Sequence, residues 1–100
     1  MVKINWTRQA IENIHEIREY FSSQSRQFAD QLTDKLFEKT KNLEQFPQIG
    51  RIVPEIDKPE IRELIFRNYR IIYLIVSNSQ IDILAVHNGF RPLTEDSLFD

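Results

Sequence analysis

The chain has 100 residues, of which 41% are hydrophobic and 28% charged, as is usual for one globular domain. It contains no Cys, which excludes disulfides, thiolate metal sites and thiol nucleophiles. No stretch has the length and hydropathy of a membrane span, and the N-terminus lacks the apolar core of a signal peptide, which favours a cytoplasmic protein. The formal net charge of −2 argues against broad binding to a phosphate backbone.

The first half of the sequence predicts one strand and two helices. Residues 2–6 alternate in hydropathy as a short strand does. Thr7 is expected to cap a first helix, in which apolar residues recur from Ala10 to Phe21 with a period of about 3.6 residues. A polar link at residues 22–25 leads to a second helix from Arg26 to about Gln45. Because the link is short, the two helices are expected to form an antiparallel hairpin.

The second half predicts strands. Residues 46–60 contain three of the four prolines and indicate an irregular loop. Three strands follow, over residues 61–66, 69–76 and 81–87, and they are joined by turns short enough for hairpins. We expect the acidic residues 92–100 to be an appendage.

The order of the elements predicts an α+β fold, β-α-α-β-β-β, with an antiparallel helical hairpin packed on one face of a mostly antiparallel sheet. A single domain would cover residues 1–91, with an acidic C-terminal tail at residues 92–100. The strand over residues 69–76 is apolar on both faces, whereas two helices can cover one face only. We therefore expect the tail, a second copy or a partner to cover the other face, and such a face indicates a binding protein.

Several motifs follow one another along nearly the whole chain. They are Trp6-Thr7-x-x-Ala10, Leu43-x-x-Phe46-Pro47-x-x-Gly50-Arg51-x-Val53-Pro54-Glu55, Ile61-Arg62-Glu63-Leu64, Tyr69-Arg70-Ile71-Ile72-Tyr73 and Ile81-x-Ile83-Leu84-x-Val86-His87. In this order the chain resembles the RelE/ParE superfamily, the toxins of type II toxin–antitoxin systems, which act in plasmid stabilisation and growth arrest. The resemblance implies a cognate antitoxin, a target that is either DNA gyrase or messenger RNA on the ribosome, and no cofactor. It also implies a hetero-oligomer with the antitoxin, with a homodimer as the alternative.

The register of the last two strands brings two polar residues together. If residues 77–80 form a four-residue loop, Val76 pairs with Ile81. Counting back along both strands then places Arg70 opposite His87.

A candidate catalytic set follows from this register. If Arg67 and Asn68 form a two-residue loop, Glu63 lies opposite Ile72 and one diagonal step from Arg70. A metal-free ribonuclease needs a base, a phosphate clamp and an acid, and Glu63, Arg70 and His87 would supply them in that order. The alternatives are an ordinary cross-strand ion pair between Glu63 and Arg70, and a structural or surface role for His87.

The same region is rich in cations. Between Ile61 and Arg91 there are four Arg and two acids. We expect three of these cations to bind the target or a phosphate, namely Arg62, Arg67 and Arg91.

Two departures from the RelE pattern favour the ParE-like branch. RelE-type nucleases carry several lysines after the second helix, whereas this chain offers only Lys58 in that region. They also carry an aromatic hydroxyl near the C-terminus, where this chain has Phe90 and Phe99, which lack a hydroxyl. The resemblance then implies a toxin that inhibits DNA gyrase by binding. A RelE-like, metal-independent, ribosome-dependent endoribonuclease and a non-toxic relative acting as a binding module are the alternatives.

Other aromatic and polar residues have ordinary structural interpretations. Trp6 and Tyr20 are predicted to be core aromatics. Glu55 is predicted to be a solvated loop acid and His15 a surface residue.

Overall fold

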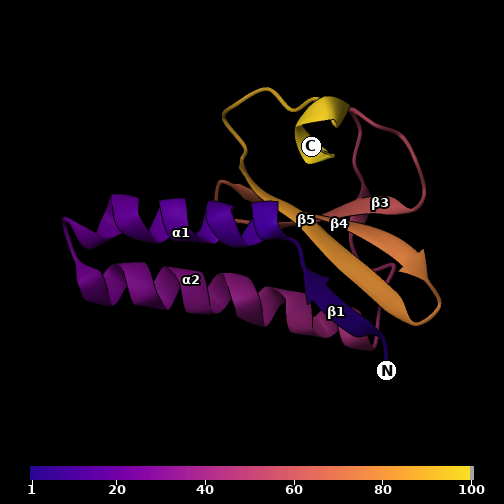
Figure 1. The fold of residues 1–100 in the computed structure, drawn as a ribbon, viewed down its shortest axis with the longest axis horizontal. Coiled ribbons are helices and arrows are strands. Elements are labelled where there is room, and N and C mark those ends of the chain that lie inside the picture. The colour runs from indigo at the N-terminus through magenta and orange to yellow at the C-terminus, as the bar shows by residue number, and fades with distance from the viewer. Residues whose placement is uncertain (100) are drawn as a thin grey trace.

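The predicted α+β fold is confirmed in a computed structural model, which describes residues 1–99 (Figure 1). Two antiparallel helices pack against one face of a five-stranded sheet. The helices of residues 1–99 lack the combination of length and hydropathy that a bilayer-spanning helix requires. The elements are β1 (Lys3–Trp6), α1 (Arg8–Ser22), α2 (Arg26–Lys41), the 3-10 turn η1 (Asn42–Glu44), β2 (Arg51–Ile52), β3 (Ile61–Phe66), β4 (Tyr69–Ser77), β5 (Gln80–Asn88) and the 3-10 turn η2 (Glu95–Leu98).

Both helices begin at a capping hydroxyl, as the sequence predicts. The Thr7 hydroxyl accepts a hydrogen bond from the backbone N–H of Ala10 at 3.3 Å. The Ser25 hydroxyl accepts one from the N–H of Phe28 at 3.1 Å. These bonds satisfy donors that the first turn of a helix leaves without a partner.

The strands form one sheet in the order β1-β5-β4-β3-β2. The N-terminal strand β1 runs parallel to β5, and all other neighbouring pairs are antiparallel. The short strand β2 was not expected, because its two residues lie in a segment predicted to be a loop. The predicted register between β3 and β4 is confirmed, with Glu63 paired to Ile72.

The register between β4 and β5 contains two irregularities that cancel. Ile81 pairs one residue earlier on β4 than predicted, so the expected Val76–Ile81 pair is wrong and Val76 is an extra residue of β4. A second shift makes Leu84 an extra residue of β5. Because the two extra residues lie on opposite strands, the shifts offset each other and Arg70 pairs with His87 as predicted.

The helix-covered face of the sheet holds the larger core. Buried residues of both helices meet alternate residues of β4 and β5, among them Leu32, Leu36, Ile71, Tyr73 and Ile83. Trp6 packs at the edge of this core, with its ring 4.5 Å from that of Phe37. The prediction for Tyr20 is wrong, because its side chain is 69% exposed near the end of α1.

The chain itself covers the second face of the sheet. Val53 and Ile56 from the loop and Leu93 and Leu98 from the C-terminal segment pack against apolar residues of β3, β4 and β5. Residues 92–99 are therefore not a free appendage. Of the three expected covers, the tail is the one found, together with the loop, so this face gives no indication of a binding partner.

Two polar contacts fasten the C-terminal segment to the rest of the molecule. The Lys58 ammonium lies 2.8 Å from the Glu95 carboxylate. The amide of Gln9 on α1 donates a hydrogen bond to the Ser97 carbonyl at 2.6 Å.

Candidate functional site

A buried carboxylate lies on the second face of the sheet. The Glu63 side chain on β3 has no solvent exposure. One of its oxygens accepts a hydrogen bond from Nε of Arg51 on β2, and the other accepts one from Nε of Arg70 on β4, each at 2.6 Å. A buried carboxylate is retained at modest energetic cost only when such partners replace its water, and here two guanidinium groups do so.

Arg70 joins this carboxylate to a second one from the loop. Its two terminal nitrogens donate to the two oxygens of Glu55 at 2.7 Å each, a bidentate pair. These bonds lower the pKa of Glu55 from 4.5 to about 2. The bonds to Glu55 and Glu63 raise the pKa of Arg70. Glu55 is an exposed loop acid, as predicted, but the sequence does not indicate that Arg70 binds both of its oxygens.

We call these four residues, Arg51, Glu55, Glu63 and Arg70, the charge network. Its formal charges sum to zero, and it ties strand β2 and the following loop to the middle of the sheet. The sequence suggested the cross-strand partners Glu63 and Arg70. It missed Arg51 and Glu55, because β2 and the loop reach the sheet through tertiary packing that hydropathy periodicity does not encode.

The loop before β2 is held by close contacts with the sheet. The Tyr73 hydroxyl donates to the Pro47 carbonyl at 2.8 Å and accepts from the Gly50 N–H at 3.0 Å. A Cβ at Gly50 would lie 2.6 Å from the Glu63 carbonyl oxygen, so only glycine fits there. Arg62 donates to the carbonyls of Pro59 and Gly50, at 2.9 and 3.0 Å. The Arg62 guanidinium thus supports the loop.

His87 lies beside the charge network but makes a separate contact. Its Cα is paired with that of Arg70, so both side chains lie on the same face. The imidazole Nε2 is 2.9 Å from the Arg91 carbonyl oxygen. His87 and Arg91 line a groove of about 620 Å³ between α1, β5 and the C-terminal segment. The structure thus brings Glu63 and Arg70 into direct contact and places His87 in the neighbouring groove.

Arg67, another of the predicted target-binding cations, is exposed in the hairpin between β3 and β4. Its guanidinium carbon is 5.4 Å from the centre of the Phe66 ring and 5.9 Å from that of Phe28 on α2. It forms no salt bridge within residues 1–99. Its charge is therefore free for an external anion.

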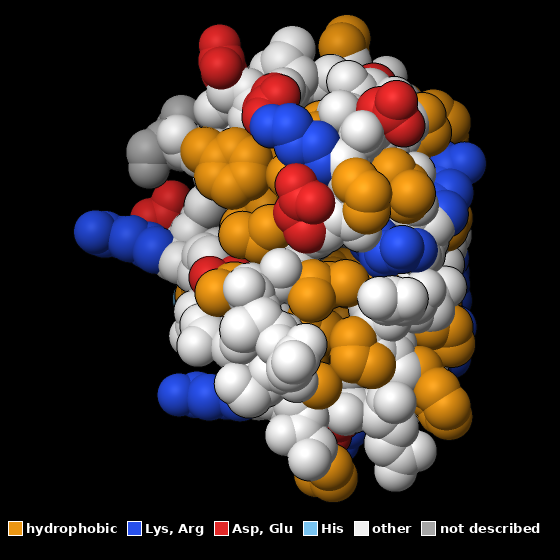
Figure 2. All heavy atoms as spheres, turned by 90° about the vertical axis from the view of Figure 1, so that its right-hand side faces the viewer, with side chains coloured by type: hydrophobic (Ala, Val, Ile, Leu, Met, Phe, Trp, Pro, Cys, Tyr) orange, Lys and Arg blue, Asp and Glu red, His pale blue; other side chains and the backbone are white. Residues whose placement is uncertain are grey.

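An apolar hollow of about 590 Å³ lies at the turn between β4 and β5, where Figure 2 shows apolar side chains gathered on one face. Every residue lining it is uncharged, and Phe46 and Ile49 are more than half exposed. Exposed apolar clusters of this kind are typical of protein contact surfaces.

The geometry of the charge network favours a structural role. A general base needs a free oxygen within reach of the proton that it removes. Both Glu63 oxygens accept a hydrogen bond from a guanidinium N–H. All three nitrogens of the Arg70 guanidinium donate to carboxylate oxygens. Between the two interpretations of this pair, the arrangement favours the cross-strand ion pair.

The comparisons with known proteins agree with this fold. The family model described as "ParE toxin of type II toxin-antitoxin system, parDE" matches residues 4–91. A chain of the solved structure "Chromosomal ParDE TA system from P. aeruginosa" is similar at a TM-score of 0.73 and 22% identity, and the match covers 88% of this chain and 96% of that chain. No curated protein gives a match. The family match spans most of the chain, which therefore belongs to the ParE toxins, the toxin components of type II toxin–antitoxin systems.

Proposed function

We propose that the chain is a toxin that inhibits DNA gyrase by binding it, and that a cognate antitoxin neutralises it. The observation that carries the choice of binding over cleavage is the charge network. Of the three groups in the candidate ribonuclease set, Glu63 and Arg70 are occupied by one another and by Arg51 and Glu55. Because these two groups are engaged within the fold, we infer that the toxin acts through its surface.

Two surfaces support action by contact. The apolar hollow beside Phe46 suits the apolar side chains of a protein partner, which is the chemistry expected of an antitoxin that wraps the toxin. On another part of the molecule, Arg67 offers a charge that has no carboxylate partner among residues 1–99. The protein can therefore meet an apolar segment and an anionic surface in different places.

A supercoiling assay tests the target. Purified protein added to gyrase and relaxed plasmid is expected to reduce supercoiling in proportion to its concentration. Primer extension on translated messages in cells that express the protein is expected to show no new cleavage ends. Growth arrest with new cleavage ends, together with unaffected supercoiling at large molar excess, would establish the ribonuclease alternative.

A co-expression experiment tests the antitoxin. A short reading frame that abuts or overlaps the gene for this chain should restore growth when both are induced, and its product should co-purify with the toxin. Growth that stays arrested despite a soluble neighbouring product would contradict neutralisation by that product.

A further inference from the structure

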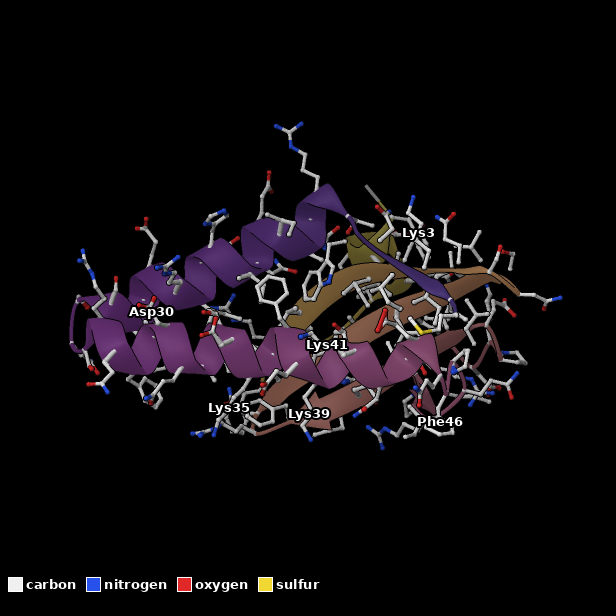
Figure 3. The ribbon with its side chains drawn as sticks, turned by 90° about the horizontal axis from the view of Figure 1, so that it is seen from below. Lys3, Asp30, Lys35, Lys39, Lys41 and Phe46 are labelled. Carbon is white, nitrogen blue, oxygen red and sulfur yellow. The ribbon has the colours of Figure 1, made fainter. Side chains whose placement is uncertain are left out.

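Cations and aromatic rings gather where α2 passes the hairpin between β3 and β4. Lys39 on α2 has its ammonium 5.7 Å from the centre of the Phe66 ring, and Arg67 lies over the same ring. Lys35 lines the same shallow hollow of about 260 Å³, one helical turn away from Lys39. Figure 3 shows Lys35 and Lys39 on one side of α2. We call Lys35, Lys39, Phe66 and Arg67 the cationic hairpin surface.

Residues 1–99 leave the positive charge of this surface without salt-bridge partners. None of its three cations forms a salt bridge within residues 1–99. Glu38 is the one acid among the residues that line the hollow. A local excess of positive charge therefore remains on a chain whose formal net charge is −2.

Arg67 occupies an unfavourable backbone conformation. Its φ is +55°, a value that glycine, asparagine and aspartate adopt far more readily than arginine. Two-residue hairpin loops favour those small residues at such positions. The hairpin thus gives up stability at Arg67, and the guanidinium is directed over the rings of Phe66 and Phe28. Backbone strain of this kind is typical of positions that are retained for a contact.

We propose that the cationic hairpin surface is the contact through which the toxin holds an acidic surface of its protein target. The inference rests on the proposed function, because it assumes a protein target. Arginine and aromatic side chains dominate the energetics of protein interfaces, and a guanidinium held against rings loses little freedom on binding a carboxylate. Protein carboxylates fit this surface better than a phosphate backbone does, because the net negative charge of the protein repels nucleic acid.

Three variants test the surface. Arg67→Gly removes both the guanidinium and the strained backbone, so its melting midpoint is expected to stay within about 4 °C of the wild type. Lys39→Gln removes a second cation. Lys41→Gln is the matched control, since it changes an exposed lysine of the same helix that lies about 200° around the axis from Lys39.

Growth arrest on induction and inhibition of gyrase supercoiling are the readouts. Arg67→Gly is expected to need about tenfold more protein for half-inhibition, Lys39→Gln several-fold more, and Lys41→Gln the same amount as the wild type. Raising the salt concentration should narrow these differences, because it screens the contact.

The outcomes separate this inference from the proposed function. Suppose that the wild type arrests growth without inhibiting gyrase, and that arrest is lost in Arg67→Gly but kept in Lys41→Gln. That result would overturn gyrase as the target and support the cationic hairpin surface. Folded Arg67→Gly and Lys39→Gln proteins that arrest growth and inhibit gyrase like the wild type would overturn the surface alone. A gel shift of bare linear DNA by the wild type that Arg67→Gly abolishes would also overturn it, since the anion would then be a phosphate. Absence of arrest by soluble wild-type protein would overturn both.

Discussion

Replacing Glu63 by glutamine tests the charge network most directly. The amide keeps the shape of the side chain but removes its charge and one of its two acceptor oxygens. Among residues 1–99, Arg70 is then left with one carboxylate partner, Glu55, and the Arg70 side chain is only 11% exposed to water. Arg51 is 59% exposed, so water can solvate it once its partner is lost.

The expected loss of stability follows from these exposures. A hydrogen bond to a charged group contributes about 1.5–3 kcal/mol, and the glutamine oxygen can still accept one of the two bonds. Removing one partner of a fully buried pair costs about 3–5 kcal/mol, because it leaves a charge without compensation. Since Glu55 still balances Arg70, the lower end applies, and we expect a loss of about 3 kcal/mol. For a domain of 100 residues this lowers the melting midpoint by about 12 °C or more.

Urea unfolding measures this loss, with the fluorescence of the single tryptophan, Trp6, as the signal. Glu95→Gln is the control, because it breaks a pair with Lys58 in which both side chains are about half exposed, and it should cost less than about 1 kcal/mol. A Glu63→Gln protein as stable as this control would refute the structural role. A Glu63 carboxylate that served as a general base would give just that pattern, with unchanged stability and lost cleavage.

Three further predictions follow from the same contacts. Because the pKa of Glu55 is lowered from 4.5 to about 2, its ion pair should stabilise the fold fully above pH 4.5 and progressively less as the pH falls towards 2. The urea midpoint of Glu55→Gln should therefore vary less with pH over this range than that of the wild type. An equal dependence of the two midpoints on pH would contradict the prediction. Gly50→Ala should destabilise the fold by about 2 kcal/mol or more in urea unfolding, because its methyl would lie 2.6 Å from the Glu63 carbonyl oxygen. By the same measurement, Leu98→Ala should cost about 2 kcal/mol and Phe99→Ala less than about 1 kcal/mol, since Leu98 is buried against the sheet and Phe99 is half exposed. A loss for Leu98→Ala as small as that for Phe99→Ala would show that the C-terminal segment is not packed.

The helices and the three long strands are predictable from the sequence because each has a strong local signal. Thr7 and Ser25 mark helix starts through their hydroxyls, and the apolar periods distinguish helix from strand. The contact between Glu63 and Arg70 is predictable because a two-residue turn fixes the register of its hairpin. The pairing of Arg70 with His87 is correct for a different reason, since two irregularities cancel.

The covering of the second face is not predictable in the same way. Strand β2 has two residues, too few for any period to show. Leu93 and Leu98 lie among polar and acidic residues, so composition identifies them as a tail although their side chains are buried. What places these segments is the apolar face of β4 and β5, which any apolar side chain within reach can cover. Contacts of this kind depend on the whole fold, and the sequence pattern of the segment alone does not specify them.

The distribution of the arginines links the fold to the proposed activity. Arg51, Arg62 and Arg70 all bond within the protein, to carboxylates or to loop carbonyls, and they hold the loop against the sheet. Arg67 makes no such bond to any residue that the structure describes, and it lies over aromatic rings at a strained turn. Glycine would make this turn more stable than arginine does, so the stability of the fold does not explain the arginine at this position. Two groups of arginines can therefore be distinguished, those that hold the fold together and Arg67, which is free to bind a target. Substitutions in the first group should lower stability more than activity. Substitution of Arg67 should lower activity more than stability.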